Sequence, residues 1–223
     1  ALPVELPSIA DALGLSAVQT GGVSVIVALV SATFILPVGR LADIIGRRRI
    51  FATGLAIVAT GLAASALAPS WLLLMAALAL TGLGTAMSIA TGMALLSSAF
   101  PAQERGRALG MVTAAVYLGH TLGPSIGGLL THHFGWRSIF GLLAMLGLAV
   151  AAVAVLFLPE TRISATPESD RPGFLKSLSI LARLPAFWTY ALTCAFGTAV
   201  FFSFLGGTPF VAIDMLGMTG TEY

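Results

Sequence analysis

The sequence has very few charged residues: Asp, Glu, Lys and Arg make up 9% of its 223 residues, against about 25% in soluble domains. Its single cysteine, Cys194, excludes an internal disulfide. Apolar residues make up 57% and the mean hydropathy is +0.99. Because so few charges cannot cover a soluble surface, the composition indicates an integral membrane protein. It argues against a disordered chain, a secreted disulfide scaffold and a cytosolic enzyme.

The sequence also lacks the residue clusters that catalysis needs. His120 is the only ionisable residue near the middle of an apolar stretch, so we expect no enzyme and no cofactor. There is no Gly-x-x-x-x-Gly-Lys loop to hold ATP. His132 and His133 have no Cys or acid at metal-ligand spacing, and we expect no metal site there. The basic residues flank apolar stretches, which disfavours nucleic-acid binding.

Six apolar stretches are long enough to cross a bilayer, which takes about 20 residues. None alternates with period two, so a transmembrane barrel is disfavoured. The chain opens without Met, and residues 1–9 read as the end of one further span; we therefore expect a fragment. The six predicted spans are residues 17–38, 50–67, 71–97, 108–130, 138–158 and 187–211.

Positive charge alternates between the connections. The successive connections hold 4, 0, 2, 1, 4 and 0 Lys and Arg residues. The positive-inside rule places the first, third and fifth in the cytoplasm. The sequence thus predicts a multi-pass protein of the cytoplasmic membrane, in contact with the lipid bilayer.

The longest polar stretch divides the chain. Residues 166–172 read as a linker, and residues 173–183 have one apolar and one polar helical face. That pattern predicts an interfacial helix on the cytoplasmic surface, or alternatively a plain extension of the next span. We expect a transmembrane bundle at 1–158, a cytoplasmic linker at 159–186 and the start of a second bundle at 187–223.

Residues 39–49, Gly-Arg-Leu-Ala-Asp-Ile-Ile-Gly-Arg-Arg-Arg, join two spans with little slack. Gly39 lets backbones approach closely, and Gly46 permits a tight reversal. Asp43 is expected to cap the next helix, and the arginines can pair with it or reach lipid headgroups. An ordinary basic loop is the alternative.

This stretch resembles the cytoplasmic signature between the second and third helices of the major facilitator superfamily. In that family the loop is a latch between the two six-helix halves. By resemblance, the latch residues here are Gly39, Asp43, Gly46, Arg47 and Arg48. Arg105 and Arg107, in the next basic loop, are their possible partners.

A second motif, Gly119-His-Thr-Leu-Gly123-Pro124-Ser-Ile-Gly127-Gly128, lies in the fourth predicted span. Glycines 119, 123 and 127 share a helical face on which another helix can pack, and Pro124 bends the span. The alternative is a generic packing face. The spacing resembles the antiporter signature of facilitator-superfamily exporters, where the bend shapes the cavity and seals it against ions.

Two acid–base candidates remain. His120 changes protonation near neutral pH and suits proton transfer, or it is a neutral ring hydrogen-bonded to a neighbouring helix. Glu5 is the only acid near the first helix, either at the outer mouth or as an exposed helix-end acid. Leu78 and Thr81 stand where drug exporters often have the Arg and Gln of an Arg-x-x-Gln-Gly pattern, which leaves the coupling ion open.

Residues near the two ends of the chain resemble a particular branch of the superfamily. Residues 6–14 resemble the close of the first helix in drug:proton antiporters. Residues 187–223 resemble the seventh helix and following loop of the bicyclomycin/chloramphenicol-resistance branch.

The resemblance implies an all-α facilitator-type bundle: the N-terminal six-helix half with a truncated first helix, plus the first helix of the second half. It implies a monomeric, proton-coupled exporter of drugs or other small hydrophobic molecules, working by alternating access. The alternatives are a narrow-specificity metabolite or sugar exporter or facilitator, and a non-transporting membrane scaffold. The candidate cavity wall consists of residues that could alternatively be plain packing residues: Met87, Met93, Tyr117, Phe201 and Phe202.

Overall fold

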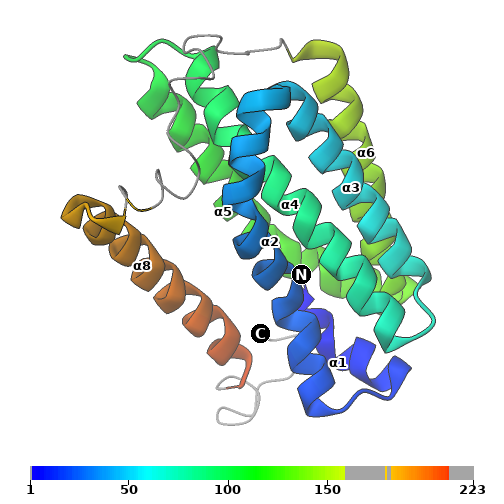
Figure 1. Ribbon diagram of the computed structural model, residues 1–223. Helices are drawn as coiled ribbons and strands as arrows, with labels where there is room; N and C mark the ends of the chain where they lie inside the picture. The colour runs from blue at the N-terminus through cyan, green and yellow to red at the C-terminus, as the bar shows by residue number, and fades with distance from the viewer. Residues whose placement is uncertain (1, 159–178, 180–181, 211–223) are drawn as a thin grey trace. The chain divides into compact units, whose positions relative to one another are not determined.

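The computed structural model describes residues 2–158, 179 and 182–210 of the chain, and these form long helices (Figure 1). Two compact units are present, Ala1–Ile163 and Ser164–Tyr223. The first holds α1 to α6 and the second holds α8. The helices are α1 (Leu2–Leu13), α2 (Ala17–Ile45), α3 (Arg47–Leu67), α4 (Trp71–Ala99), α5 (Arg105–Phe134), α6 (Arg137–Phe157) and α8 (Pro185–Phe210). The predicted all-α fold class is confirmed.

Among the residues that the structure describes, four helices are long and apolar enough to cross a membrane: Val18–Ile45, Arg47–Leu67, Trp71–Ala99 and Arg137–Phe157. These are four of the six predicted spans. The other two, α5 with 30 residues and α8 with 26, exceed the length of about 20 residues that a span needs but are not among these four. The mean hydropathy of α5 is lowered by several glycines, His120 and Pro124.

The first unit packs around α4, which contacts α2 on one side and α3 on another. Glycines make these contacts close. A Cβ added to Gly82 would lie 2.8 Å from the Val27 carbonyl oxygen of α2, and one added to Gly54 of α3 would lie 2.7 Å from the Met87 Cβ. Small residues allow this approach, as is usual where helices pack in lipid.

Two apolar clusters fill the spaces between the helices. One is centred on Ile9, Val23, Leu74, Leu78 and Phe140, from α1, α2, α4 and α6. The other consists of buried residues of α2, α3 and α4, namely Val38, Ala42, Ile50 and Met87. The sequence predicts Met87 in a cavity wall, but it is packed in this core because its position on α4 faces α3.

The basic connections of the first unit lie at one end of the bundle. Figure 1 shows the α2–α3 junction, the α4–α5 connection and the end of α6 at one end of the bundle, and the α1–α2, α3–α4 and α5–α6 connections at the other. We call the former the basic end. The arrangement agrees with the alternation of charge along the sequence, on which the predicted cytoplasmic orientation of this end rests.

The structure corrects one expectation, and two others concern residues that it does not describe. The first predicted span ends at residue 38, but α2 continues to Ile45, because the polar residues of the motif leave helical geometry intact. The predicted interfacial helix at 173–183 and the linker at 166–172 lie almost entirely outside the described residues.

Candidate functional site

A single residue, Gly46, separates α2 from α3 at the basic end. Its backbone angles are φ 121° and ψ 132°, a conformation that L side chains rarely adopt but glycine adopts freely. Gly46 is buried, and its N–H donates to the Ala42 carbonyl oxygen at 3.0 Å. The predicted tight reversal at this glycine is confirmed.

Asp43 lies in the last turn of α2 and forms an ion pair with Arg47 in the first turn of α3. Arg47 Nη2 and Nε donate to Asp43 Oδ1 at 3.0 and 3.2 Å. The side chains are 23% exposed for Arg47 and 45% exposed for Asp43, so the pair contributes only about 0–1 kcal/mol to stability. It ties the two helices across Gly46 and can open at small cost.

The expectation that Asp43 caps the next helix is wrong. The N-cap of α3 is Gly46, and no side chain hydrogen-bonds to it there. The physical reason is the length of α2: since this helix runs on to Ile45, Asp43 precedes the break instead of following it. Its carboxylate therefore serves Arg47 rather than the α3 backbone.

Gly39 lies farther from the junction, on the side of α2 that contacts α4. A Cβ added there would be 4.0 Å from the Ala90 Cβ, an ordinary van der Waals distance. The two helices are in contact at this level, but less closely than at Gly82.

Arg48 reaches a different helix from Arg47. Its Nη2 donates to the Val155 carbonyl oxygen in the last turn of α6. Arg137, at the start of α6, similarly donates from Nη2 to the Ala68 carbonyl oxygen at 3.0 Å. Neither contact is predicted by the sequence. The available signal was arginine in the first turn of a helix, where positive charge is usually unfavourable.

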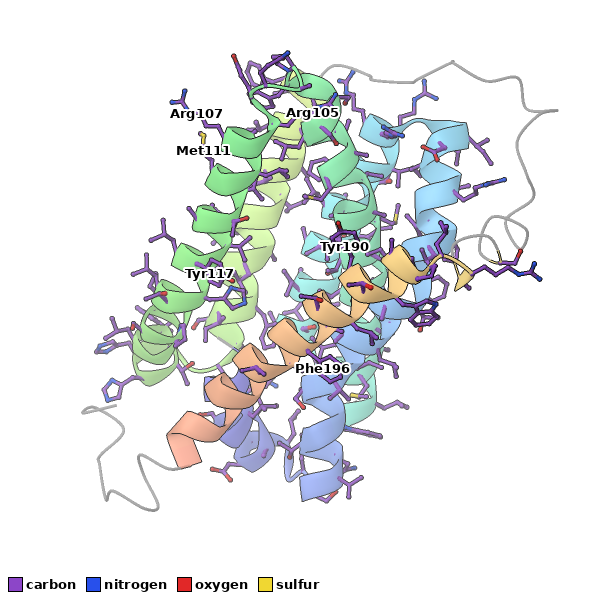
Figure 2. The ribbon with its side chains drawn as sticks, turned by 90° about the vertical axis from the view of Figure 1, so that its left-hand side faces the viewer. Arg105, Arg107, Met111, Tyr117, Tyr190 and Phe196 are labelled. Atoms are coloured by element: carbon purple, nitrogen blue, oxygen red, sulfur yellow. The ribbon has the colours of Figure 1, made fainter. Side chains whose placement is uncertain are left out.

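Arg105 and Arg107 lie at the start of α5, with Met111 and Tyr117 farther along the same helix (Figure 2). Arg105 Nε donates to the Phe100 carbonyl oxygen at 3.2 Å, beside the end of α4. Both arginines are exposed at the basic end. Among the described residues, the ion-pair partner of Asp43 is Arg47, so Arg105 and Arg107 stay proposed partners for another state.

A groove of about 350 Å³ separates the end of α4 from the start of α5. Met93, Ser97, Arg105 and Leu109 are among the residues that line it. Met93, a predicted cavity residue, is therefore part of an open, mostly apolar surface. Tyr117 is exposed on α5, and the side chains of Phe201 and Phe202 lie outside the described part of the structure.

The glycine–proline motif lies within α5, which continues through Pro124. Gly127 is buried, while Gly123 and Pro124 are half-buried. A Cβ added to Gly119 or Gly128 would meet no described atom within 4 Å. Only part of the predicted packing face is covered by the described residues, and the predicted bend and seal stay a proposal.

His120 is half-buried on α5, and its Nδ1 lies 2.9 Å from the Val116 carbonyl oxygen. Because a carbonyl oxygen only accepts, Nδ1 carries a proton in this contact. Glu5 belongs to α1, but its side chain is outside the description. His132 and His133 are exposed, and the described residues contain no group of three metal-binding side chains.

Comparisons with known proteins agree with the resemblance. The family model described as Major Facilitator Superfamily matches residues 1–223. The multidrug resistance protein Stp of Mycobacterium tuberculosis is 40% identical over 145 residues, 65% of the chain. The riboflavin transporter RibZ of Clostridioides difficile is 31% identical over 175 residues, 78% of the chain. The multidrug resistance protein MdtL of Escherichia coli is 28% identical over 221 residues, 99% of the chain.

The chain is short beside these relatives. It spans 27% of the length of Stp, 38% of RibZ and 56% of MdtL. The similarity therefore concerns part of each relative.

Proposed function

The chain belongs to the Major Facilitator Superfamily, and from this we infer that it works in a secondary transporter that exports small, partly hydrophobic molecules across the cytoplasmic membrane. The observation that carries the proposal is the junction at Gly46. There the family signature folds into a one-residue break with a partly exposed Asp43–Arg47 ion pair across it. Two relatives are named as multidrug resistance proteins, which supports drugs as the substrate class.

The proposed mechanism is alternating access, in which two helical bundles rock about a site between them. In this mechanism the Asp43–Arg47 pair, with Gly39, Gly46 and Arg48 around it, acts as the latch. A latch must open and close in every cycle, so its contacts must be weak. An ion pair with both partners partly exposed meets that requirement.

We propose that protons drive the export. Each elementary charge that crosses the membrane gains about 2.3 kcal/mol per 100 mV, enough to move a neutral molecule against its gradient. His120 and Glu5 are the candidate proton-binding residues, and the transporter is proposed to act as a monomer without a cofactor.

A vesicle experiment tests the coupling. The intact protein is reconstituted with a pH-sensitive dye inside the vesicles, and a hydrophobic cationic drug is added. We expect drug movement to change the internal pH and to speed up when a pH gradient is imposed. Drug movement at the same rate with and without a pH gradient would exclude antiport. An absence of drug movement would favour the non-transporting scaffold.

A second candidate function is export or facilitated diffusion of one metabolite. The similarity to a protein named riboflavin transporter supports it. A panel of chemically unrelated compounds separates the two functions. Competition by many of them for uptake into inverted vesicles supports multidrug export, whereas competition by a single compound class supports the metabolite transporter.

Replacing His120 by glutamine is expected to flatten the pH dependence of transport, because His120 is a candidate proton-binding residue and a glutamine side chain cannot take up a proton. Glutamine keeps a polar side chain of similar reach, and its amide can donate to the Val116 carbonyl oxygen that His120 Nδ1 contacts. The check is the transport rate of His120→Gln between pH 5.5 and 8. A profile equal to that of the parent protein would exclude His120 and leave Glu5 as the candidate.

A further inference from the structure

The groove between the end of α4 and the start of α5 combines an apolar wall with one cation. Met93 and Leu96 line it from α4, and Leu109 lines it from α5. Among the described residues of this lining, Arg105, the first residue of α5, is the charged one. The two helices make few contacts with each other, so the groove, about 350 Å³ in volume, stays open between them.

The apolar wall of the groove is accessible from outside the bundle. Met93 is 51% exposed and Leu109 is 38% exposed. Exposed large apolar side chains that lie together mark a surface that contacts lipid or protein. An occupant of this groove must therefore present hydrocarbon to Met93 and Leu109.

Arg105 places a guanidinium beside this apolar wall. Its Nε donates to the Phe100 carbonyl oxygen at 3.2 Å, which holds the side chain against the end of α4. Within the described part of the chain, its two Nη groups have no acidic partner. The remaining N–H groups of an arginine form a planar fork that matches the oxygens of a phosphate. The occupant is therefore expected to carry a phosphate beside its hydrocarbon.

The charge around the groove decides which phosphate carrier fits. On or beside the α2–α3 and α4–α5 connections the chain has six arginines and two acids: Arg40, Arg47, Arg48, Arg49, Arg105, Arg107, Asp43 and Glu104. This excess of positive charge attracts anionic lipid headgroups at a membrane surface. It repels a cationic drug, and it also repels the ammonium group of a zwitterionic lipid. An anionic phospholipid satisfies both the apolar wall and the charge.

We propose that the groove between α4 and α5 binds one anionic phospholipid from the leaflet at the basic end, with the phosphate at Arg105 and an acyl chain along Met93, Leu96 and Leu109. The bound lipid fills the space that the few contacts between the two helices leave open, and it holds the start of α5 against α4. This inference goes beyond the proposed transport function. It requires that the basic end lies at a membrane surface, not that the chain transports.

Native mass spectrometry of the intact protein, purified in detergent, tests the site. Phosphatidylglycerol and phosphatidylethanolamine with the same acyl chains are added at equal concentrations. We expect one phosphatidylglycerol to bind in preference, and Arg105→Gln to lower its binding about tenfold, as the loss of a hydrogen bond between charged groups predicts. Arg105→Lys should keep part of the binding.

Arg107→Gln is the matched control. It removes the same charge two residues away, on the opposite side of the start of α5 (Figure 2), and Arg107 does not line the groove. This variant should bind phosphatidylglycerol as the parent protein does. Equal loss of binding in Arg105→Gln and Arg107→Gln would overturn the site and assign the binding to the net charge of the basic end.

A second variant tests the apolar wall without removing charge. Met93→Trp places a bulky ring in the groove from an exposed position on α4, so the bundle should fold as before, while phosphatidylglycerol binding should fall about fivefold or more through steric overlap. Excess inorganic phosphate should not displace the lipid, since it has no hydrocarbon. Displacement by phosphate would overturn the proposal, and so would unchanged binding in Arg105→Gln and Met93→Trp, the result expected if another part of the intact protein covers the groove. If the parent protein does not transport, the transport proposal fails and these measurements still decide the lipid site.

Discussion

Replacing Gly84 by alanine is expected to destabilise the protein by about 1–3 kcal/mol, because a well-packed helix contact would be overfilled. The added Cβ would lie 2.6 Å from the Gly54 carbonyl oxygen and 2.7 Å from the Val58 backbone nitrogen. Both are backbone atoms of α3, which cannot turn aside as a side chain can. The helices α3 and α4 would have to separate, although they are the most extensively packed pair of the first unit.

At a matched glycine, the same substitution is expected to change the stability in the opposite direction. Gly141 lies in α6, and a Cβ there would meet no described atom within 4 Å. Gly141→Ala should therefore keep the stability or raise it by up to about 1 kcal/mol, since alanine is the better helix former. Thermal unfolding of the two purified variants in detergent measures the difference. Equal melting temperatures would show that α3 and α4 are not in the described contact.

The sequence predicts the helices well but not which of them touch. Long apolar stretches specify spans almost by themselves, since lipid leaves the backbone no alternative to internal hydrogen bonds. Gly82 and Gly84 could be identified as a small-residue pair within one helix. Their partners, Val27 of α2 and Gly54 of α3, depend on helix order and rotation, which no local pattern determines.

In the candidate site, too, local features could be predicted from the sequence but contacts between helices could not. The reversal at Gly46 follows from local chemistry, because glycine alone tolerates such backbone angles. The role of Asp43 could not be predicted in the same way, since it depends on whether α2 ends before or after that residue, and helix boundaries are the least reliable part of a sequence prediction. The Arg48 and Arg137 contacts join residues 107 and 69 positions apart. They could be seen only once α3 and α6 were known to be neighbours.

Replacing Asp43 by asparagine is expected to slow transport about tenfold or more, if conformational exchange at the latch limits the rate. The melting temperature should change little, because the Asp43–Arg47 pair is partly exposed and contributes only about 0–1 kcal/mol. This combination distinguishes a latch from a structural ion pair. Drug uptake into vesicles and thermal unfolding are measured on the same preparation.

Arg47→Gln should reproduce the defect, and the double variant should be no slower than either single variant, because both changes remove the same contact between Nη2 and Oδ1. Glu104→Gln is the control: Glu104 is also an exposed carboxylate at the basic end, next to the start of α5. It should transport at the parental rate. If Glu104→Gln were as slow as Asp43→Asn, the loss would reflect the net charge of this end rather than the junction. If the two single defects multiplied in the double variant, Asp43 and Arg47 would act through separate contacts, and the ion pair across Gly46 would not be the latch.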